Sequence, residues 1–355
     1  MKNLLLFSFF LRFTIFTICV FLFSTCQKPN PEAIFVSNLI LNKNELILEI
    51  GEKETLIATL YPDNVINKRV IWTSSDTLTA TVNDEGLVTA INKGNAIITV
   101  TTEEGEKSDT CSVVVSLKRL RIVHWSDPQL GWGYVKDETA IRAVQLINEI
   151  NPDIVMLAGD MIHTYDKIDD FLKIVANVKV PILFTPGNHD LSDSVTTEVL
   201  QRYRSFFGDD FITMEIKDFF IISANSSLLL YPDDVPKEEY NQHYARVNEA
   251  LKYAQSKNMP VITMTHIAPF QQPDILKLFV ENGTFLWISG HWHIPYQQSL
   301  VFPYGTINIL VGESSGWNDN YPLGVRLLTI YSDKSFDWVS IPLYQQGQYQ
   351  LPIIK

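Results

Sequence analysis

The chain has 355 residues, of which 46% are hydrophobic, and its 40 acidic residues outnumber 28 basic ones to give a net charge of −12. This length and composition are typical of folded domains with sizeable apolar cores. Because a net negative surface repels phosphate backbones, the charge argues against nucleic acid as a partner.

The first 25 residues predict a secretory signal peptide. Lys2 and Arg12 precede an apolar run over residues 13–23, which is too short to span a bilayer. The run ends at Cys26 in a pattern that resembles a lipoprotein signal, which implies that Cys26 is lipidated and becomes the new N-terminus. We expect a membrane-anchored lipoprotein of the bacterial envelope, in the periplasm or at the cell surface. An uncleaved anchor helix and plain soluble secretion are the alternatives.

Cysteine usage agrees with an extracytoplasmic location. Of the three cysteines, Cys19 lies in the signal and Cys26 would carry lipid, which leaves Cys111 without a partner for an intrachain disulfide. Cleavage would also remove Lys2 and Arg12. The mature chain would then carry 26 basic and 40 acidic residues, a net charge of −14.

Residues 26–37 predict a short extended tether after the lipidated cysteine, since Pro29 and Pro31 stand among polar residues. Residues 38–116 predict a small all-β domain, because short alternating runs are separated by turn residues. The expected strands cover residues 46–50, 55–60, 70–73, 79–82, 86–90, 96–101 and 110–115.

This segment also resembles the bacterial immunoglobulin-like group 2 domain. The resemblance rests on residues 70–76, 80–82, 86–90 and 94–100, and it covers nearly the whole segment. It implies a spacer or adhesive module. We see no catalytic cluster in the segment, and we interpret Trp72 as a core aromatic.

Residues 117–355 predict an α/β domain. Helices are expected over residues 138–149, with Asp137 as the N-cap, and over residues 167–177 and 237–256, alternating with apolar runs. Four strand-like runs follow without helices between them, over residues 300–303, 306–311, 325–331 and 336–341. These elements favour a two-sheet sandwich flanked by helices, for which about 235 residues suffice.

Five apolar runs of this domain end in side chains that bind metals well. The runs cover residues 121–126, 154–158, 180–185, 261–265 and 285–289, and the residues that follow them include Asp127, Gln129, Asp160, Asn188, His189, Asp190, His266, His291 and His293. Open α/β folds bind ligands at the carboxyl ends of their strands. Carboxylate, amide oxygen and imidazole suit hard and borderline divalent ions. One such residue is usually structural, but five strand ends together predict a metal site.

In this order the residues resemble the motifs of the calcineurin-like metallophosphoesterases, which run Asp-x-His, Gly-Asp, Gly-Asn-His-Asp/Glu, His and Gly-His-x-His. The matches are Asp127, Asp160, Asn188 with His189 and Asp190, His266, and His291 with His293. The resemblance extends from about residue 117 to the C-terminus. The sequence Asp-Pro-Gln-Leu-Gly is most similar to the branch that contains calcineurin-like phosphoesterase domain-containing protein 1.

The resemblance implies a phosphomonoesterase or phosphodiesterase that holds two divalent metal ions, Mn, Fe, Mg or Zn, and uses a metal-bound hydroxide as nucleophile. Asp160 would bridge the two metals. The ligands that would complete one site are Asp127 and His293, and those of the other are Asn188, His266 and His291. His189 would protonate the leaving alkoxide, held and polarised by Asp190. A structural role for His189 is the alternative.

Gln129 departs from the family pattern, which usually has a ligand histidine there. An amide oxygen is a weaker and harder donor, so affinity for zinc should drop relative to manganese, iron or magnesium. His163 stands three residues after Asp160, where the purple acid phosphatase branch has a tyrosine ligand. We therefore hypothesise that His163 reaches the first metal or the bound substrate. The alternative is that His163 merely lines the mouth of the cleft.

Three aromatic residues in glycine-rich loops, Trp132, Tyr134 and Trp317, are candidates for lining the substrate. Exposed rings could stack on a sugar, a base or a phenolic leaving group, although core packing is the alternative. The substrate class stays open among small phosphomonoesters, nucleotides, phosphorylated glycans and phosphoproteins.

A rival interpretation comes from a different functional class. The protein would be a catalytically weak cell-surface binding or adhesion protein, built on a phosphoesterase scaffold that is impaired at Gln129. Retention of His189, Asp190 and the other expected ligands speaks against this alternative.

Overall fold

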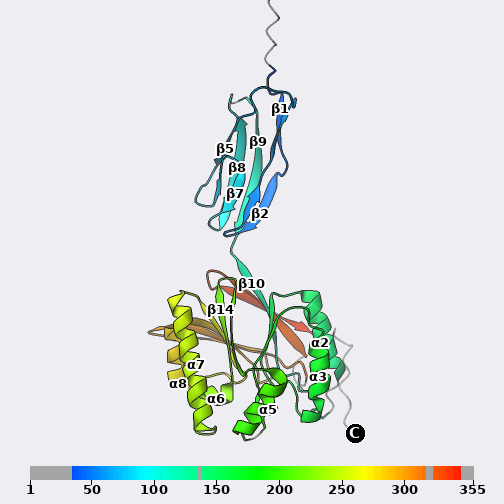
Figure 1. Cartoon of the computed structure of the whole chain (residues 1–355), viewed down its shortest axis with the longest axis vertical. Helices are drawn as coiled ribbons and strands as arrows, with labels where there is room; N and C mark the ends of the chain where they lie inside the picture. Colours follow the sequence, from blue (N-terminus) through cyan, green and yellow to red (C-terminus); the bar gives the residue numbers. More distant parts are fainter. Residues whose placement is uncertain (1–33, 105, 134–136, 193, 317–322, 345–355) are drawn as a thin grey trace, which may run out of the picture. The chain divides into compact units, whose positions relative to one another are not determined.

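The computed structural model describes residues 34–104, 106–133, 137–192, 194–316 and 323–344. The chain divides into two compact units between Leu117 and Lys118 (Figure 1). The expected signal peptide, Cys26, Tyr134 and Trp317 lie outside the described residues. Within the described ranges, no helix is both long and apolar enough to cross a membrane.

The N-terminal unit consists of short strands in three small sheets, with the orders β1-β4, β2-β9-β8-β5 and β3-β7-β6. Strand β2 runs parallel to β9, and the other paired strands are antiparallel. Alternate side chains form one core, against which Trp72 packs as expected. The strands are β1 Asn38–Leu41, β2 Glu45–Glu49, β3 Lys53–Thr55, β4 Ala58–Tyr61, β5 Val70–Ser74, β6 Ala80–Val82, β7 Leu87–Ala90, β8 Gly94–Thr102 and β9 Ser108–Ser116.

The single strand expected over residues 55–60 is wrong, because the chain changes sheets there. Leu56 N donates a hydrogen bond to Gly86 O beside β7, while Ile57 O accepts one from Asn42 N beside β1. The segment therefore splits into β3 and β4, which belong to different sheets. Apolar alternation continues through the crossing and hides it in the sequence.

The C-terminal unit has two sheets, with the orders β12-β11-β10-β19-β20 and β13-β14-β15-β16-β18-β17. In the first sheet β12, β11 and β10 are parallel neighbours, while β19 pairs antiparallel with both β10 and β20. In the second sheet β14, β15, β16 and β18 are parallel neighbours, and β13 and β17 pair antiparallel at the two edges. The strands are β10 Arg119–Trp125, β11 Ile154–Leu157, β12 Ile182–Phe184, β13 Phe211–Ile216, β14 Phe219–Ala224, β15 Val261–Met264, β16 Thr284–Ser289, β17 Tyr296–Phe302, β18 Gly305–Val311, β19 Gly324–Tyr331 and β20 Phe336–Pro342.

Helices cover the outer faces of both sheets (Figure 1). Helices α2, α3 and α5 contribute to the core of the first sheet, and α6, α7 and α8 to that of the second. The helical segments are α2 Asp137–Ile150, the 3-10 turn η1 Tyr165–Lys167, α3 Ile168–Val175, α4 Asn188–Leu191, α5 Thr197–Phe207, α6 Ser226–Leu230, α7 Lys237–Ser256 and α8 Pro273–Glu281.

A third core lies between the two sheets. Ile122 of β10 packs there with Ile221 and Met264 of the second sheet, while the next residue, Val123, packs against the helices. Successive side chains of a strand point to opposite faces, so each sheet is buried on both sides. The expected sandwich of two sheets flanked by helices is confirmed.

One expected element differs in its bounds, and one hairpin was not expected. Of the helix expected over residues 167–177, α3 covers Ile168–Val175, and the 3-10 turn η1 precedes it. The hairpin of β13 and β14 was not anticipated, because β14 ends in Asn225 rather than in a metal-binding side chain. Asn225 Oδ1 instead accepts hydrogen bonds from Ser227 N and Leu228 N at the start of α6.

Candidate metal centre

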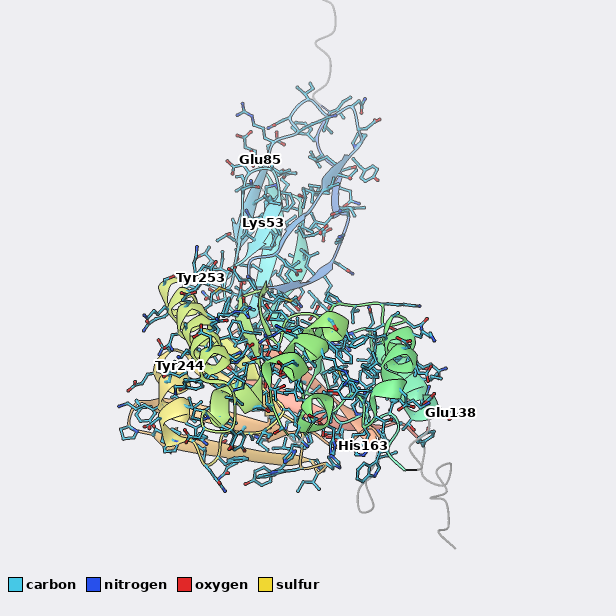
Figure 2. All side chains as sticks on the ribbon, turned by 60° about the horizontal axis from the view of Figure 1, so that its bottom comes forward. Lys53, Glu85, Glu138, His163, Tyr244 and Tyr253 are labelled. Atoms are coloured by element: carbon cyan, nitrogen blue, oxygen red, sulfur yellow. The ribbon has the colours of Figure 1, made fainter. Side chains whose placement is uncertain are left out.

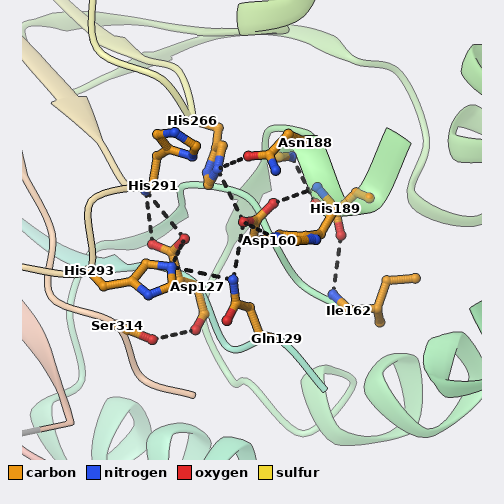
Figure 3. Close-up of polar contacts among 12 residues, drawn as sticks. Asp127, Gln129, Asp160, Ile162, Asn188, His189, His266, His291, His293 and Ser314 are labelled. Atoms are coloured by element: carbon orange, nitrogen blue, oxygen red, sulfur yellow. Dashed lines mark hydrogen bonds and ion pairs between the residues drawn. The ribbon is translucent and has the colours of Figure 1, made fainter. Parts of the chain in front are cut away.

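The expected metal ligands converge at the carboxyl ends of strands from both sheets (Figure 3). Strands β10, β11 and β12 are parallel neighbours in one sheet, and β15 and β16 are parallel neighbours in the other. Parallel strands end at the same edge of a sheet, so the residues that follow them meet. Those residues are Asp127 and Gln129 after β10, Asp160 after β11, Asn188 after β12, His266 after β15, and His291 and His293 after β16.

Asp127, Asp160 and His293 form one group of metal-capable side chains, whose ligand atoms lie within 4.8 Å of one another. His293 Nε2 is 3.2 Å from Asp127 Oδ1. Gln129 reaches the same place, since its Nε2 atom is 3.3 Å from Asp160 Oδ2 and 3.3 Å from His293 Nε2. The structure therefore brings all four residues of the expected first site together.

Asp160, His266 and His291 form a second group with the same limit of 4.8 Å, so Asp160 belongs to both groups. His266 Nε2 lies 3.3 Å from Asp160 Oδ2 and 3.1 Å from Asn188 Oδ1. One carboxylate shared by two ligand groups is the arrangement that a bridged pair of metal ions requires.

The charges of Asp160 and His266 stabilise each other. Burial alone would lower the pKa of His266, but the Asp160 carboxylate outweighs burial and raises this pKa to about 10. Burial would raise the pKa of Asp160, but the charge and hydrogen bond of His266 hold it well below its ordinary value. Without metal, the site therefore keeps a proton that a metal ion must displace.

The Gln129 amide supplies a test of whether metal ions fit. Its Oε1 atom is buried and has no hydrogen-bond partner. The oxygen and nitrogen of an amide are nearly indistinguishable by shape, and a half turn exchanges them. The oxygen would then face Asp160 and His293, where a cation would satisfy it. With carboxylates, amide oxygens and imidazoles as donors, the residues present fit a pair of borderline divalent ions.

Five site residues adopt the left-handed backbone conformation, which is uncommon for residues other than glycine and costs free energy. Neighbouring hydrogen bonds hold this conformation in place. The carbonyl oxygen of Asp127, for example, accepts hydrogen bonds from Ser314 Oγ at 2.9 Å and from Gly316 N at 3.0 Å. The five residues and their φ angles are Asp127 (50°), Gln129 (46°), Asp160 (53°), His291 (73°) and His293 (58°).

Gly187 and Gly290 let the loops approach the two carboxylates. A Cβ atom at Gly187 would overlap the Asp160 carboxylate, and one at Gly290 would lie 2.6 Å from Asp127 Oδ2. The φ of Gly187 is −94°, so small size rather than an unusual backbone angle is the requirement at that position.

Contrary to the expectation from the sequence, Asp190 does not contact the His189 ring. Its carboxylate accepts hydrogen bonds from the backbone N–H groups of Met161 at 2.9 Å, Ile162 at 3.2 Å and Gly187 at 2.8 Å. The His189 ring instead faces the metal groups, with Nε2 3.9 Å from Asp160 Oδ2. Asp190 therefore fixes the loops that carry Asp160 and Asn188, rather than polarising His189.

His163 lies beside His189 and belongs to neither described metal group. Its ring centroid is 4.6 Å from that of His189 and 4.0 Å from that of Trp132. Figure 2 shows His163 near the edge of the C-terminal unit. Of the two alternatives for His163, this geometry favours the lining of the cleft. The Trp132 ring packs edge-on against the His163 ring, and its expected contact with substrate stays a prediction.

The segment 313–316, which was not predicted from the sequence, follows β18 and forms hydrogen bonds with the loop that contains Asp127. Besides the two bonds to Asp127, Ser315 N donates to Ser126 O at 3.0 Å, and Ser315 Oγ accepts from Trp125 Nε1 at 2.6 Å. The signal was available, since residues 312–316 read Gly-Glu-Ser-Ser-Gly directly after an apolar run. The segment contains no histidine, so it was not recognised as part of the metal site.

Two family profiles match the chain. Residues 35–113 match the bacterial Ig-like domain (group 2), and residues 120–295 match the calcineurin-like phosphoesterases. The C-terminal unit belongs to the calcineurin-like phosphoesterase family. Both resemblances inferred from the sequence are thus confirmed. All seven expected ligands of the phosphoesterase domain lie inside the matched residues.

Relatives cover different parts of the chain. An uncharacterized protein of Clostridium acetobutylicum is 38% identical over 108 residues, which are 30% of this chain and 11% of that protein. Human serine/threonine-protein phosphatase CPPED1 is 22% identical over 223 residues, covering 54% of this chain and 69% of the phosphatase. A solved dimetal phosphatase from Danio rerio is 13% identical, with a TM-score of 0.47, over 64% of this chain and 97% of that one.

Proposed function

We propose that the phosphoesterase domain hydrolyses phosphate esters with two divalent metal ions. The observation that carries this proposal is the pair of ligand groups that share Asp160. Asp127, Gln129 and His293 would hold one ion, and the remaining ligands around His266 the other. Such ions, when bound, neutralise phosphate oxygens and lower the pKa of water.

His189 is placed to move a proton during the reaction. Its side chain is 33% exposed, and with Asn188 it lines a cleft next to the ligand groups. An imidazole changes charge near neutral pH, so it can protonate a leaving alkoxide in that cleft. The backbone N–H of His189 donates to Asp160 Oδ1 at 3.0 Å, which fixes its position relative to the centre.

We also propose that the protein is a lipoprotein of the bacterial envelope, anchored through lipid on Cys26, with the Ig-like domain as a spacer. The sequence pattern that ends at Cys26 and the family of the N-terminal unit support this proposal. Labelling with a radioactive fatty acid tests it. Label on the wild type and none on Cys26→Ser is the expected result, and equal labelling would exclude this anchor.

A hydrolysis assay of the detergent-solubilised full chain tests the enzymatic proposal. The protein is stripped of metal by chelation and then supplied with manganese, iron, magnesium or zinc. The substrates are para-nitrophenyl phosphate and bis-para-nitrophenyl phosphate. Asn188→Ala removes a ligand, and Asn95→Ala alters an exposed asparagine of the Ig-like domain as a matched control.

Turnover that depends on added metal, survives in Asn95→Ala and is lost in Asn188→Ala is the expected result. The ratio of the two rates then separates a phosphomonoesterase from a phosphodiesterase. A folded protein that binds metal but turns over neither ester would contradict the proposal and support the alternative of a surface binding protein.

A further inference from the structure

A cleft of about 840 Å³ lies next to the ligand groups, with Asn188 and His189 in its lining. Four segments form its walls: the loop after β11, α4 with the chain that follows it, the α6–α7 connection, and Ile267 after β15. Its volume is in the range of small-molecule sites. Because its lining includes His189, whose Nε2 atom is 3.9 Å from Asp160 Oδ2, the cleft adjoins the ligand groups and has room for the leaving group of an ester bound there.

The described lining of the cleft has neither a lysine nor an arginine to pair with a second anionic group. Its described lining contains one carboxylate, that of Asp234, and neither lysine nor arginine. Arg202 stands over the Tyr165 ring, 3.3 Å from the centroid, and is not part of the lining. An additional phosphate or carboxylate would therefore face Asp234, and within the described lining only the imidazoles of His163 and His189 could offset its charge.

The cleft also offers hydroxyl groups that are free to bind a ligand. The hydroxyls of Thr164, Ser227 and Tyr231 form no hydrogen bond with other residues that the structure describes. A purely apolar leaving group would remove water from these hydroxyls and leave them unpaired. Val235 and Ile267 provide apolar surface beside them.

We propose that this cleft binds an uncharged polyol, and that the substrate is a phosphate ester of a sugar with the sugar as leaving group. This inference rests on the proposed phosphoesterase activity. A sugar has hydroxyls for Asp234 and Tyr231, and C–H groups for Val235 and Ile267. His189, between the cleft and Asp160, would protonate the sugar oxygen.

Two sugar phosphates that differ by one phosphate test the charge argument. Glucose 6-phosphate and glucose 1,6-bisphosphate share the same ring, but the second always places a phosphate in the cleft. We measure kcat/KM for both with the metal-loaded full chain, and their binding by ligand-observed NMR. The monophosphate is expected to be preferred about tenfold, because the second phosphate meets Asp234 with no lysine or arginine in the described lining.

Three variants locate the effect. Asp234→Lys should reverse the preference, whereas Asp233→Lys, which makes the same charge change at an exposed residue outside the lining, should leave it nearly unchanged. Tyr231→Phe should lower kcat/KM for glucose 6-phosphate about fivefold, the effect of one lost neutral hydrogen bond.

The outcomes separate this inference from the activity on which it rests. If para-nitrophenyl phosphate is hydrolysed but the bisphosphate is used as well as the monophosphate, or Asp234→Lys acts no differently from Asp233→Lys, the sugar site is wrong and the phosphoesterase stands. If no ester is hydrolysed but NMR shows the preference and its reversal in Asp234→Lys, the cleft is a polyol site and the activity fails.

Discussion

Arg326 and Glu313 form an ion pair, 3.0 Å from Nη2 to Oε2, with both side chains buried. Arg326 is paired across the strands with His124, and burial together with the Arg326 charge lowers the pKa of His124 well below its usual value. The residue after Glu313 is Ser314, which donates to the carbonyl of Asp127. The ion pair thus supports the segment that holds the first metal ligand.

The first prediction concerns this pair. Glu313→Gln leaves the buried guanidinium without its counter-charge, and we expect the free energy of unfolding to fall by about 3–5 kcal/mol. Urea denaturation measures the loss. Combining it with Arg326→Met removes both charges and should restore most of the stability. A single variant as stable as the wild type would show that the pair does not hold the segment.

The second prediction is that metal binding releases a proton. The pKa of His266 is about 10 without metal, whereas a ligand imidazole must be neutral. Near pH 7, binding should therefore release about one proton, and apparent affinity should rise about tenfold per pH unit until His266 titrates. Isothermal titration calorimetry in buffers of different ionisation enthalpy counts the proton.

A matched pair of histidine variants checks the source of that proton. His266→Ala should abolish the release and weaken binding, while His243→Ala, which removes a buried histidine of α7 outside both metal groups, should change neither. Proton release that persists undiminished in His266→Ala would assign it to another group.

The third prediction follows from Asp190. Burial and the charge of Asp160 raise the pKa of Asp190 to about 7, against hydrogen bonds that lower it. This folded-state value exceeds the unfolded value of about 3.9, so ionised Asp190 weakens the metal-free fold. Its contribution to stability is complete below about pH 4 and is lost as the pH rises through 7.

The side chain of the Asp190→Asn variant does not titrate. The variant also loses an acceptor for buried N–H groups, which should lower the free energy of unfolding by about 1–3 kcal/mol. The stability advantage of the wild type over the variant should therefore be larger at about pH 5 than at about pH 8. Urea denaturation in chelator measures it, and Asp166→Asn, at an exposed aspartate, is the control. An advantage that grows with pH would contradict the raised pKa.

The fourth prediction concerns the Ig-like domain. Gly86 has φ 79°, and a Cβ atom there would overlap the carbonyl of Leu56 and lie 2.8 Å from Trp72 Cζ2. Gly86→Ala should cost about 2 kcal/mol or more, from backbone strain and overpacking. Calorimetry of the full chain should show a lowered transition for this domain alone.

A control separates backbone strain from overlap. At Gly208, with φ 84°, no heavy atom of the described residues other than its two chain neighbours lies within 4 Å of the place that a Cβ atom would take. Gly208→Ala in the phosphoesterase domain should therefore cost only the strain, about 1 kcal/mol. Equal losses in the two variants would rule out a packing role for the contact with Trp72.

The fifth prediction tests the amide ligand. Gln129→His replaces a hard oxygen donor by an imidazole beside Asp160 and His293, so zinc should gain affinity relative to manganese. Competition between the two ions, measured by metal analysis after dialysis, reports the change. Gln145→His, on the outer side of α2, is the control and should leave the ratio unaltered.

Much of the fold and of the candidate site could be predicted from local patterns in the sequence. Helix α7 has the bounds that its periodicity predicted, because an amphipathic stretch of that length has few alternatives. The polar residues after five strands were identifiable because each one interrupts an apolar run. Their meeting at one place follows from the parallel order of the strands, which the α/β pattern indicated.

The tertiary structure decided which groups those residues face. Asp190 was expected beside the His189 ring, its chain neighbour, but it accepts hydrogen bonds from Met161 and Ile162, about 28 residues away in the chain. Segment 313–316 holds Asp127 from across the fold. The cleft around Tyr231 and Asp234 combines four separate segments. Sequence periodicity reports which face of an element is buried, whereas contacts between distant segments depend on how the packed elements are placed, which no local pattern encodes.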